Sequence, residues 1–263
     1  MTDQESPEWL NMDDFAEGID TNRLPQTDAL AGRSFTVNLE GSGQLTVEFD
    51  ATTVTWTASG VAWQGSGTDE YEAIAIGVGA FWVDFSQADR KVETTTLVFS
   101  PEAGWALAVH SLIHGEDFTT ETRVMQTFHP GRIAGVSDDV ELPAPSRDLI
   151  GKRTLFRYSA HHLYEHIYLS SRRFTWHNLI GEQRGHAASE LATTYKLEEG
   201  MYLFTWREEK IPVGTVFVFD YARGRSTGKF IGITGAGEVA NSPGGAEIIE
   251  FGFSDYSAYA EPV

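Results

Sequence analysis

The chain carries the same β-rich pattern twice, and this internal repeat limits its fold more than any other feature of the sequence. The offset between the two copies grows by one residue from each motif to the next, as one-residue insertions in loops would produce. We interpret the pattern as a tandem repeat of one β-unit of about 110 residues. The repeated motifs are Leu30-Ala-Gly-Arg33 with Leu149-Ile-Gly-Lys152, Val54-Thr-Trp56 with Phe174-Thr-Trp176, and Gly79–Phe85 with Gly200–Trp206.

Each copy consists of short runs rich in Val, Thr, Phe, Tyr and Trp, separated by Gly, Asp, Asn or Ser. This spacing is typical of an antiparallel sandwich or barrel, and closure into a barrel leaves no free sheet edge. We therefore predict an all-β protein of two tandem antiparallel β-barrels. The strands expected in the first copy are Ser34–Leu39, Gln44–Phe49, Thr52–Ala58, Glu70–Ile76, Ala80–Phe85, Glu93–Phe99 and Trp105–Leu112.

Clusters of proline, glycine and acidic residues mark boundaries that divide the chain into four parts. We expect an acidic N-terminal helix and linker in residues 1–29, a first barrel in 30–129, a linker in 130–148 and a second barrel in 149–263. Ser6 and Pro7 predict a capped start of the short helix. Apolar residues then recur with helical spacing, and we expect the helix to act as a lid or plug on the body. These residues are Trp9, Met12, Phe15, Ala16 and Ile19.

The charge balance and the absence of cysteine exclude several classes of protein. The 263 residues have a net charge of −19, nearly all of it before residue 149, which disfavours binding to nucleic acid or to an anionic membrane. Without cysteine there is no disulfide, no thiolate metal ligand and no cysteine nucleophile. No apolar run approaches the ~18 residues that a membrane span needs, and the N-terminus lacks a signal-peptide pattern. We expect a cytoplasmic protein.

Common metal and phosphate motifs are not matched. On a strand, His162 and His166 would share a face but lie about 13 Å apart, too far for one metal ion. Neither Gly65-Ser-Gly67 nor Gly235-Ala-Gly237 precedes a predicted helix, so neither is typical of a phosphate-binding loop. We expect no metal site and no cofactor.

The second copy contains a strand face of tyrosine and histidine. In the segment 164–169, alternation puts Tyr164, His166 and Tyr168 on one face, and the following strand adds Trp176. Such a face is costly inside a core unless its polar atoms find partners, but it suits a pocket for a polar aromatic ligand. The alternative is an exposed strand face of amphipathic side chains.

One acidic residue of the second copy is a candidate for proton transfer. In Trp206-Arg-Glu-Glu-Lys210, alternation puts Trp206, Glu208 and Lys210 on one side of a strand. If that side faces the barrel interior, burial against Trp and Tyr would raise the pKa of Glu208 and allow general acid or base catalysis near pH 7. The alternative is an exposed hairpin of alternating charges.

The C-terminal half resembles the MoaF proteins. The likeness is strongest in Met201-Tyr-Leu-Phe-Thr-Trp-Arg-Glu208 and in Ser226-Thr-Gly-Lys-Phe-Ile-Gly232, and it extends over roughly residues 30–255. It implies two tandem lipocalin-like (calycin) barrels. The family name refers to molybdenum cofactor biosynthesis.

The same half is also similar to phenolic acid decarboxylase, a cofactor-free lipocalin-like barrel. Tyr158 keeps one of the two tyrosines of that family's first motif, and Phe156 replaces the other. Tyr164-Glu165 matches its Tyr-Glu strand, and Gly185-His186 falls where the family has Gly-Arg. The segment Gly200–Glu208 matches its last motif and places Glu208 on the catalytic glutamate.

This resemblance implies a lyase acting on a phenolic compound. Because His186 replaces an arginine that would hold a carboxylate, protonation of a leaving hydroxyl or amine fits better than decarboxylation. We therefore expect a cofactor-independent, dehydratase- or decarboxylase-like elimination through a quinone methide, catalysed by Glu208 and His186. The residues expected to bind the substrate are Tyr158, Tyr164, His166, Trp176 and Tyr202.

The first copy lacks these titratable groups. The repeat places Leu39 opposite Tyr158, Thr68 opposite His186 and Gln87 opposite Glu208. We therefore expect the site in the second barrel and a structural or gating role for the first.

Two other functions remain open. One is a non-catalytic lipocalin-like protein that binds small molecules, and the other is a MoaF-type accessory protein that binds a partner through its acidic barrel and helix. The expected partner is a small aromatic or phenolic ligand, with no nucleic acid and no membrane. A homodimer is an open option.

Overall fold

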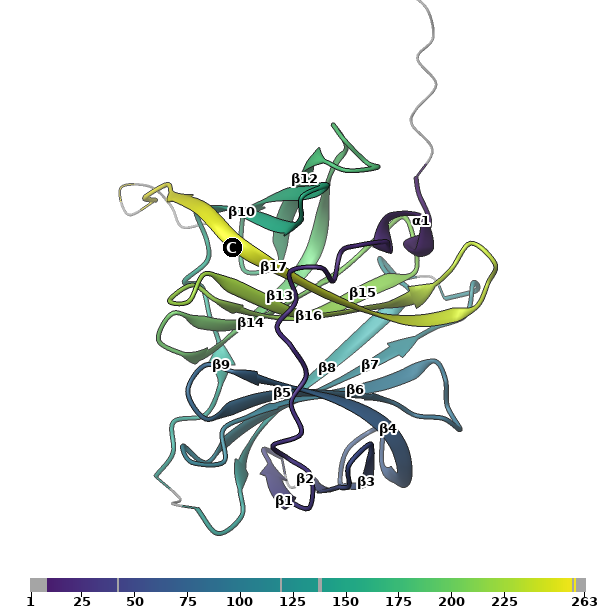
Figure 1. Ribbon diagram of the computed structural model, residues 1–263, viewed down its shortest axis with the longest axis vertical. Helices are drawn as coiled ribbons and strands as arrows, with labels where there is room; N and C mark the ends of the chain where they lie inside the picture. Colours follow the sequence, from purple (N-terminus) through teal and green to yellow (C-terminus); the bar gives the residue numbers. More distant parts are fainter. Residues whose placement is uncertain (1–8, 42, 119, 137–138, 257, 259–263) are drawn as a thin grey trace, which may run out of the picture.

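The protein consists of two closed antiparallel barrels and one short helix, which confirms the fold predicted from the sequence. The computed structural model describes residues 9–41, 43–118, 120–136, 139–256 and 258. The two barrels stack on each other, with the second above the first in Figure 1. Within the described residues, no helix is long and apolar enough to cross a membrane.

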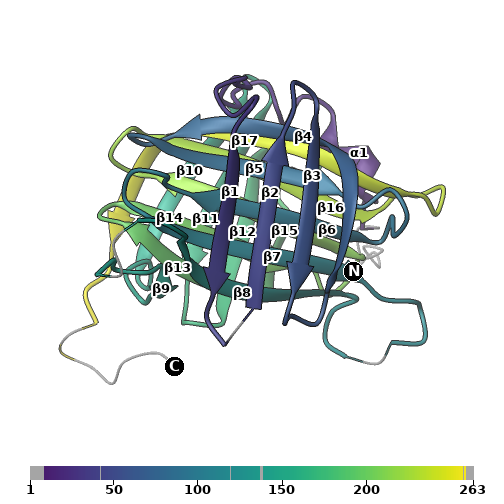
Figure 2. The same ribbon diagram turned by 90° about the horizontal axis from the view of Figure 1, so that it is seen from below.

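The first barrel has eight strands, and pairing of β1 with β8 closes it. Each of the seven strands predicted for this copy overlaps an observed one. Figure 2 views this barrel from below, with β1, β2 and β3 crossing in front of the others. The strands are β1 (Ser34–Leu39), β2 (Gly43–Phe49), β3 (Thr53–Ser59), β4 (Gly65–Ile76), β5 (Ala80–Ser86), β6 (Glu93–Phe99), β7 (Trp105–Ile113) and β8 (Val124–Ile133).

Strand β8 was not predicted, and it carries the first barrel to Ile133, past residue 130 where we placed the start of the linker. Pro130 and Gly131 are turn signals in the sequence, but both fit this strand. Pro130 is tolerated because β1 pairs with β8 only over Gly131–Ile133, after the proline. At Gly131 a Cβ atom would lie 2.7 Å from the carbonyl oxygen of Asn38, so the close approach of β1 requires glycine.

The second barrel also has eight main strands, and pairing of β12 with β13 closes it. A two-residue strand, β9 (Ala144–Pro145), lies in the linker between the barrels and pairs with β13. The strands are β10 (Lys152–Ser159), β11 (His162–Tyr168), β12 (Arg173–Ile180), β13 (Ala187–Glu198), β14 (Met201–Arg207), β15 (Val213–Asp220), β16 (Arg225–Ile233) and β17 (Val239–Phe253).

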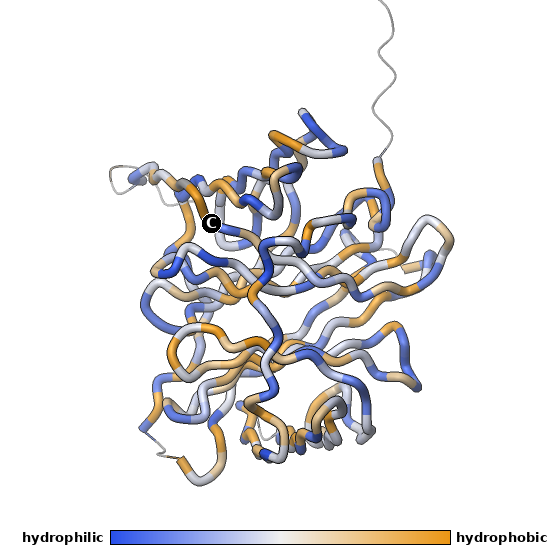
Figure 3. The backbone as a smooth tube through the Cα atoms, viewed as in Figure 1, coloured by the Kyte–Doolittle hydropathy of each residue, from blue (hydrophilic) through white to orange (hydrophobic). Residues whose placement is uncertain are grey.

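The barrels pack through outward-facing side chains of β4–β7 and β13–β15. Hydrophobic residues are frequent on the strands of both barrels, and many of those between the barrels are fully buried (Figure 3). One apolar cluster spans the interface and contains Ile74, Ile76, Ala80, Trp82, Val98, Trp105, Leu107 and Val109 of the first barrel with Leu197, Met201, Leu203, Val216 and Val218 of the second.

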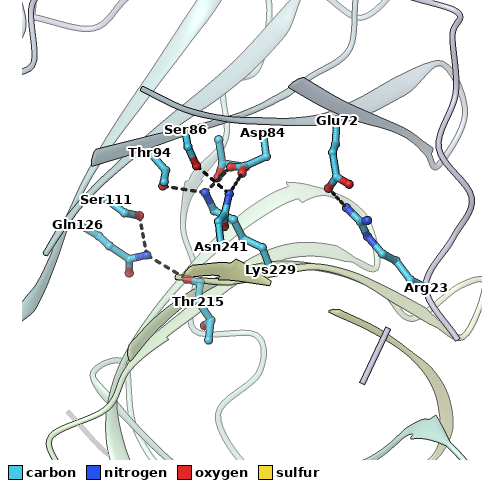
Figure 4. Close-up of polar contacts among 11 residues, drawn as sticks. Arg23, Glu72, Asp84, Ser86, Thr94, Ser111, Gln126, Thr215, Lys229 and Asn241 are labelled. Carbon is cyan, nitrogen blue, oxygen red and sulfur yellow. Dashed lines mark hydrogen bonds and ion pairs between the residues drawn. The ribbon is translucent and has the colours of Figure 1, made fainter. Parts of the chain in front are cut away.

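A buried ion pair lies in the same interface. Lys229 of β16 and Asp84 of β5 form an ion pair, with only 2% and 4% of their side chains exposed. The Lys229 ammonium also donates to Thr94 Oγ1 at 2.7 Å, and the Asn241 amide donates to Asp84 at 2.7 Å (Figure 4). Burial lowers the pKa of Lys229. Lys229 and Asn241 of the second barrel are thus paired with Asp84 and Thr94 of the first.

The N-terminal segment belongs to both barrels. Helix α1 (Met12–Ala16) lies on the second barrel, and the chain then runs down across both barrels to β1 (Figure 1). The Asn22 N–H donates to the carbonyl of Tyr158 at 3.0 Å, and the Thr27 N–H donates to that of Ala73 at 2.9 Å. The segment therefore connects the second barrel to the first by backbone hydrogen bonds.

The helix starts later than the sequence predicts. Ser6 and Pro7, the predicted cap, lie outside the described residues, and Trp9 precedes the helix. Asn11 occupies the N-cap position, and its backbone N–H donates to Asp14 Oδ2 at 2.9 Å. A carboxylate in the first helical turn satisfies this N–H and favours a helix start at Met12.

Candidate functional site

A cavity of about 30 Å³ lies inside the second barrel beneath α1. Aromatic side chains form most of its wall. This volume is room for about one water molecule, so the barrel interior is almost filled. The N-terminal segment contributes Trp9, Phe15 and Ile19, and the barrel contributes Tyr158, Tyr164, His166, Trp176, Gln183, Trp206, Glu208, Ile211 and Phe230.

Glu208 points into this cavity. It directly follows β14 and continues the alternation that turns Trp206 inward, and the Trp206 indole N–H donates to Glu208 Oε1 at 2.9 Å. Its backbone N–H donates to the carbonyl of Val213 at 2.8 Å, which fixes the turn. The side chain is only 8% exposed. Burial, followed by the neighbouring Glu190 carboxyl, raises the pKa of Glu208 well above its ordinary value of 4.5.

Glu190 is a second buried carboxyl that the sequence analysis missed. It lies on β13, is 1% exposed, and accepts the backbone N–H of Glu209 at 2.8 Å. Strand pairing of Leu191 with Arg207 brings Glu190 opposite Glu208, and each carboxyl group affects the pKa of the other. Burial is the main cause of its raised pKa. Alternation along β13 could have found it, because Glu190 shares the inward face with Ala192.

His166 is buried beside these groups as a neutral imidazole. Its ring packs against Phe156 and Phe174, with ring centroids 4.5 and 5.0 Å apart. Burial lowers its pKa from 6.5 to about 3. The Nδ1 atom has no hydrogen-bond partner among the described residues. An imidazole in this state can accept or donate one hydrogen bond to a ligand without carrying charge.

Two tyrosines supply neutral hydroxyl groups. Tyr158 and Tyr164 pack edge to face with ring centroids 5.8 Å apart, and both line the cavity. The Tyr164 hydroxyl donates to Gln183 Oε1 at 3.2 Å. Burial raises the pKa of both phenols, so both stay protonated across the physiological range.

Trp176 forms the wall between the cavity and the N-terminal segment. Its ring meets that of Trp9 edge to face at 5.8 Å. The indole N–H lies near Glu208 but makes no hydrogen bond of ordinary geometry with a described residue. It is therefore a free donor at the edge of the acidic group.

Two predicted site residues lie away from the cavity. His186 is partly exposed, and Trp9 stands against it on the outer side, with ring centroids 6.3 Å apart. Tyr202 is inward, but it lies six residues before Glu208, or about 20 Å along an extended strand. Its hydroxyl donates to Asp148 Oδ2 at 3.1 Å. Strand alternation predicts the face of a residue but not its depth in the barrel, which explains the misplacement of Tyr202.

The histidines do not gather into a metal site. The described part of the chain contains no group of three or more His, Asp or Glu side chains that could hold a metal ion. His162 instead pairs through Nδ1 with the hydroxyl of Ser159 at 2.9 Å.

Strand pairing places aliphatic residues of the first barrel where the second has polar ones. In the first barrel Val37 pairs with Leu45, and the matching pair of the second barrel is Phe156 with Tyr164. In the same way, Val47 with Trp56 matches His166 with Trp176. Leu39, Leu45, Val47 and Gln87 thus take the positions of Tyr158, Tyr164, His166 and Glu208.

The equivalence that we predicted for Thr68 is wrong. Thr68 pairs with Thr55 as Ser189 pairs with Thr175, so Thr68 corresponds to Ser189 and not to His186. The loops before β4 and β13 differ in length, which shifts the sequence offset between the two copies.

Comparison with known proteins supports the tandem organisation. Residues 7–115 match the MoaF N-terminal domain, and residues 143–252 match the MoaF C-terminal domain. "Protein MoaF" of Klebsiella aerogenes is 29% identical over 238 residues, which cover 86% of this chain and 87% of that protein. A Burkholderia vietnamiensis structure, described only provisionally as a beta-lactamase, covers 38% of this chain and 95% of its own at 18% identity, and its TM-score of 0.32 is too low to support an argument. With both of its domains matched in order, the chain belongs to the MoaF family.

Proposed function

We propose that the second barrel binds a small para-hydroxyphenyl compound and eliminates water or an amine from its benzylic carbon. The observation that carries this proposal is Glu208, a carboxyl group whose burial in an aromatic cavity raises its pKa well above 4.5. A neutral carboxylic acid in such a place is a general acid for a poor leaving group. The reaction needs only proton transfers and the exclusion of water.

The proposed reaction uses one carboxyl group twice. Glu208 donates its proton to the benzylic hydroxyl, the carbon–oxygen bond breaks, and water leaves. Electrons from the phenol oxygen form a quinone methide as the phenolic proton passes to Nδ1 of His166, which returns it in the last step. The Glu208 carboxylate then removes a proton from the adjacent methyl group, the double bond forms, and the phenol regains its proton. Para-hydroxyphenyl methyl carbinol thus gives para-hydroxystyrene and water, and the carboxyl group is restored.

The other cavity residues would hold the phenol end of the substrate. His166, neutral and with a free Nδ1, can accept the phenolic proton in a hydrogen bond. The neutral hydroxyl group of Tyr158 can donate to the developing phenolate, and that of Tyr164 can do so in place of its bond to Gln183. His166 therefore takes the role that we assigned to His186 from the sequence.

The substrate must displace part of the wall to enter. The cavity of about 30 Å³ is smaller than a phenol ring, and Trp9, Phe15 and Ile19 close it on one side. These residues lie on a short helix and its flanks, attached to the barrel by few backbone hydrogen bonds. We therefore expect movement of this segment to admit the substrate.

The test follows conversion of para-hydroxyphenyl methyl carbinol to para-hydroxystyrene by ultraviolet absorbance. We expect turnover by the wild-type protein, loss of at least a hundredfold in Glu208→Gln, and full activity in Gln87→Ala, the matched change in the first barrel. The meta isomer should not react, because its hydroxyl cannot form a quinone methide. Turnover that survives in Glu208→Gln, or equal rates for both isomers, would refute the mechanism.

A non-catalytic binding protein is the second candidate. The closed, aromatic cavity favours it, since such a site could retain a small aromatic molecule without reaction. This alternative predicts that Glu208→Gln binds para-cresol with nearly wild-type affinity and that neither protein turns over the carbinol.

A further inference from the structure

Glu190 is a buried carboxyl group for which the proposed reaction has no role. It lies on β13 at the pair position Phe174–Glu190, and Val54–Asp69 is the matching pair of the first barrel. The neighbouring pairs agree, since Ala192 pairs with Trp206 as Tyr71 pairs with Phe85. Asp69 is therefore the structural counterpart of Glu190, and Gln87 is the counterpart of Glu208.

Both barrels use this carboxyl group to hold the same stretch of backbone. Asp69 Oδ1 accepts the N–H of Ala88 at 2.9 Å, and Glu190 Oε2 accepts the N–H of Glu209 at 2.8 Å. Ala88 directly follows Gln87, and Glu209 directly follows Glu208. The anchoring of the backbone after strands β5 and β14 is thus common to both copies and requires no catalytic function.

The surroundings of the two carboxyl groups differ in one respect. In the first barrel Asp69 also accepts the Trp56 indole N–H at 2.7 Å, and its neighbour Gln87 is neutral. In the second barrel the indole of the matching Trp176 makes no such bond, and the neighbour is Glu208. Two carboxyl groups therefore meet where the first barrel has a carboxylate bonded to an indole.

No ion pair among the described residues joins a cation to Glu190 or Glu208. Arg173 of β12 affects the pKa of Glu190, but its ion pairs are with Glu209 and, at 3.4 Å, with Glu121. Across the cavity Glu208 faces Tyr164 and His166 of β11, both neutral. Two buried carboxylates in contact would repel strongly, whereas one proton between them removes the repulsion and forms a hydrogen bond.

We propose that Glu190 is a positioning residue that shares one proton with Glu208 and so keeps Glu208 in its acid form. The Glu209 backbone N–H fixes Oε2 of Glu190 and so holds the carboxyl group in place to share the proton. This inference rests on the proposed function for its catalytic meaning, but the sharing of the proton can be measured without any substrate.

The experiment is a pH titration of the full-length protein by infrared spectroscopy, following the carbonyl stretch of protonated carboxyl groups. The Glu208→Gln difference spectrum assigns the band. We expect Glu190→Gln to lower the midpoint at which Glu208 loses its proton by about one to three pH units, the usual effect of a neighbouring like charge. Asp69→Asn, the matched change in the first barrel, should leave the midpoint unchanged.

Two results would overturn the proposal. One is an unchanged midpoint in Glu190→Gln, which would leave Glu190 with only the anchoring role of Asp69. The other is an equal shift in Asp69→Asn, which would mark a general effect of weakened packing. If Glu190→Gln does not fold, the titration of Glu190 in Glu208→Gln serves instead. The hydrogen bond from protonated Glu208 lowers the pKa of Glu190, so sharing requires the midpoint of Glu190 to rise in this variant, and an unchanged midpoint refutes it.

Kinetics separate this inference from the proposed function. If the carbinol is turned over, the alkaline limb of the pH–rate profile should move to lower pH in Glu190→Gln by the same amount as the infrared midpoint. A shifted infrared midpoint in a protein that turns over no carbinol would support proton sharing and refute the lyase.

Discussion

Glu208 should lower the stability of the folded protein when the pH is above the ordinary pKa of a glutamate. Its pKa is raised by burial, so the neutral form is stable in the fold, and stability is lost as pH rises above 4.5 toward the folded pKa. Glu208→Gln removes this penalty. We expect the variant to be more stable than the wild type by about 1–3 kcal/mol at pH 8 and nearly equal at pH 4, measured by urea unfolding. Equal stability at both pH values would show that Glu208 titrates normally.

His166 should have the opposite dependence on pH. Burial lowers its pKa from 6.5 to about 3, so the unfolded chain binds a proton that the folded protein rejects between these values. Its contribution is full above pH 6.5 and is lost as pH falls toward 3, by on the order of 4 kcal/mol. Phenylalanine suits the aromatic surroundings of this position. In His166→Phe, the free energy of unfolding should therefore fall less with acidification, by that amount. Parallel curves of unfolding free energy against pH would contradict this.

At the residue scale the sequence predicted which side chains face inward but not how deep they lie. Strand alternation put Tyr164 and His166 on one face, the next strand added Trp176, and the resemblance to phenolic acid decarboxylase indicated Tyr158 and Glu208. The structure brings these five to one cavity. Strand alternation could not place Tyr202, which points inward at the other end of the barrel. Depth depends on the stagger of neighbouring strands, and a single strand carries no information about stagger.

Helix α1 should control access to the cavity. Phe15 is buried against Phe230, with ring centroids 6.0 Å apart, and forms part of the wall. Phe15→Ala should lower the free energy of unfolding by about 3–5 kcal/mol and open a path beside the helix. We expect para-cresol to associate faster with this variant, followed by stopped-flow tryptophan fluorescence.

Phe81→Ala is the matched control in the first barrel, because Phe81 is buried to a similar degree and lies far from α1 in the sequence. It should cost comparable stability and leave the association rate at the wild-type value. If both variants accelerate binding equally, general loosening and not the helix controls entry.

At the element scale most strands could be predicted from the sequence, because their runs of β-branched and aromatic residues end at glycine or polar turns. Strand β8 was missed because Pro130 and Gly131 are turn signals unless a partner strand accommodates them. The helix start was misplaced because Asn11 and Asp14 form the cap, and the apolar spacing extends past it to Trp9.

The two barrels should depend on each other through the ion pair in their interface. Lys229→Met leaves the Asp84 carboxylate buried without its cation, which we expect to cost about 3–5 kcal/mol in urea unfolding. Adding Asp84→Leu to this variant should restore part of the loss, since both charges are then removed. A double variant as unstable as the sum of the two single variants would show that the pair is not coupled.

At the scale of the whole molecule the repeat predicted two barrels but not how they dock. The interface joins outward faces of strands that are far apart in the sequence. Strand alternation predicts which face points outward but not which other face packs against it. Some signs were present, since Trp82, Val98 and Val109 are apolar on the side of the strand that a lone barrel would expose to water. The path of the N-terminal segment across both barrels had no signal in the sequence.

A crystal structure with para-hydroxyacetophenone, an unreactive relative of the carbinol, tests most directly whether the second barrel is the binding site. We expect the ligand ring between Tyr164 and Trp176, its carbonyl oxygen within hydrogen-bonding distance of Glu208, and Phe15 displaced from its present position. A ligand bound in the first barrel or on the outer surface, with the second barrel still filled by its own side chains, would contradict the proposed function.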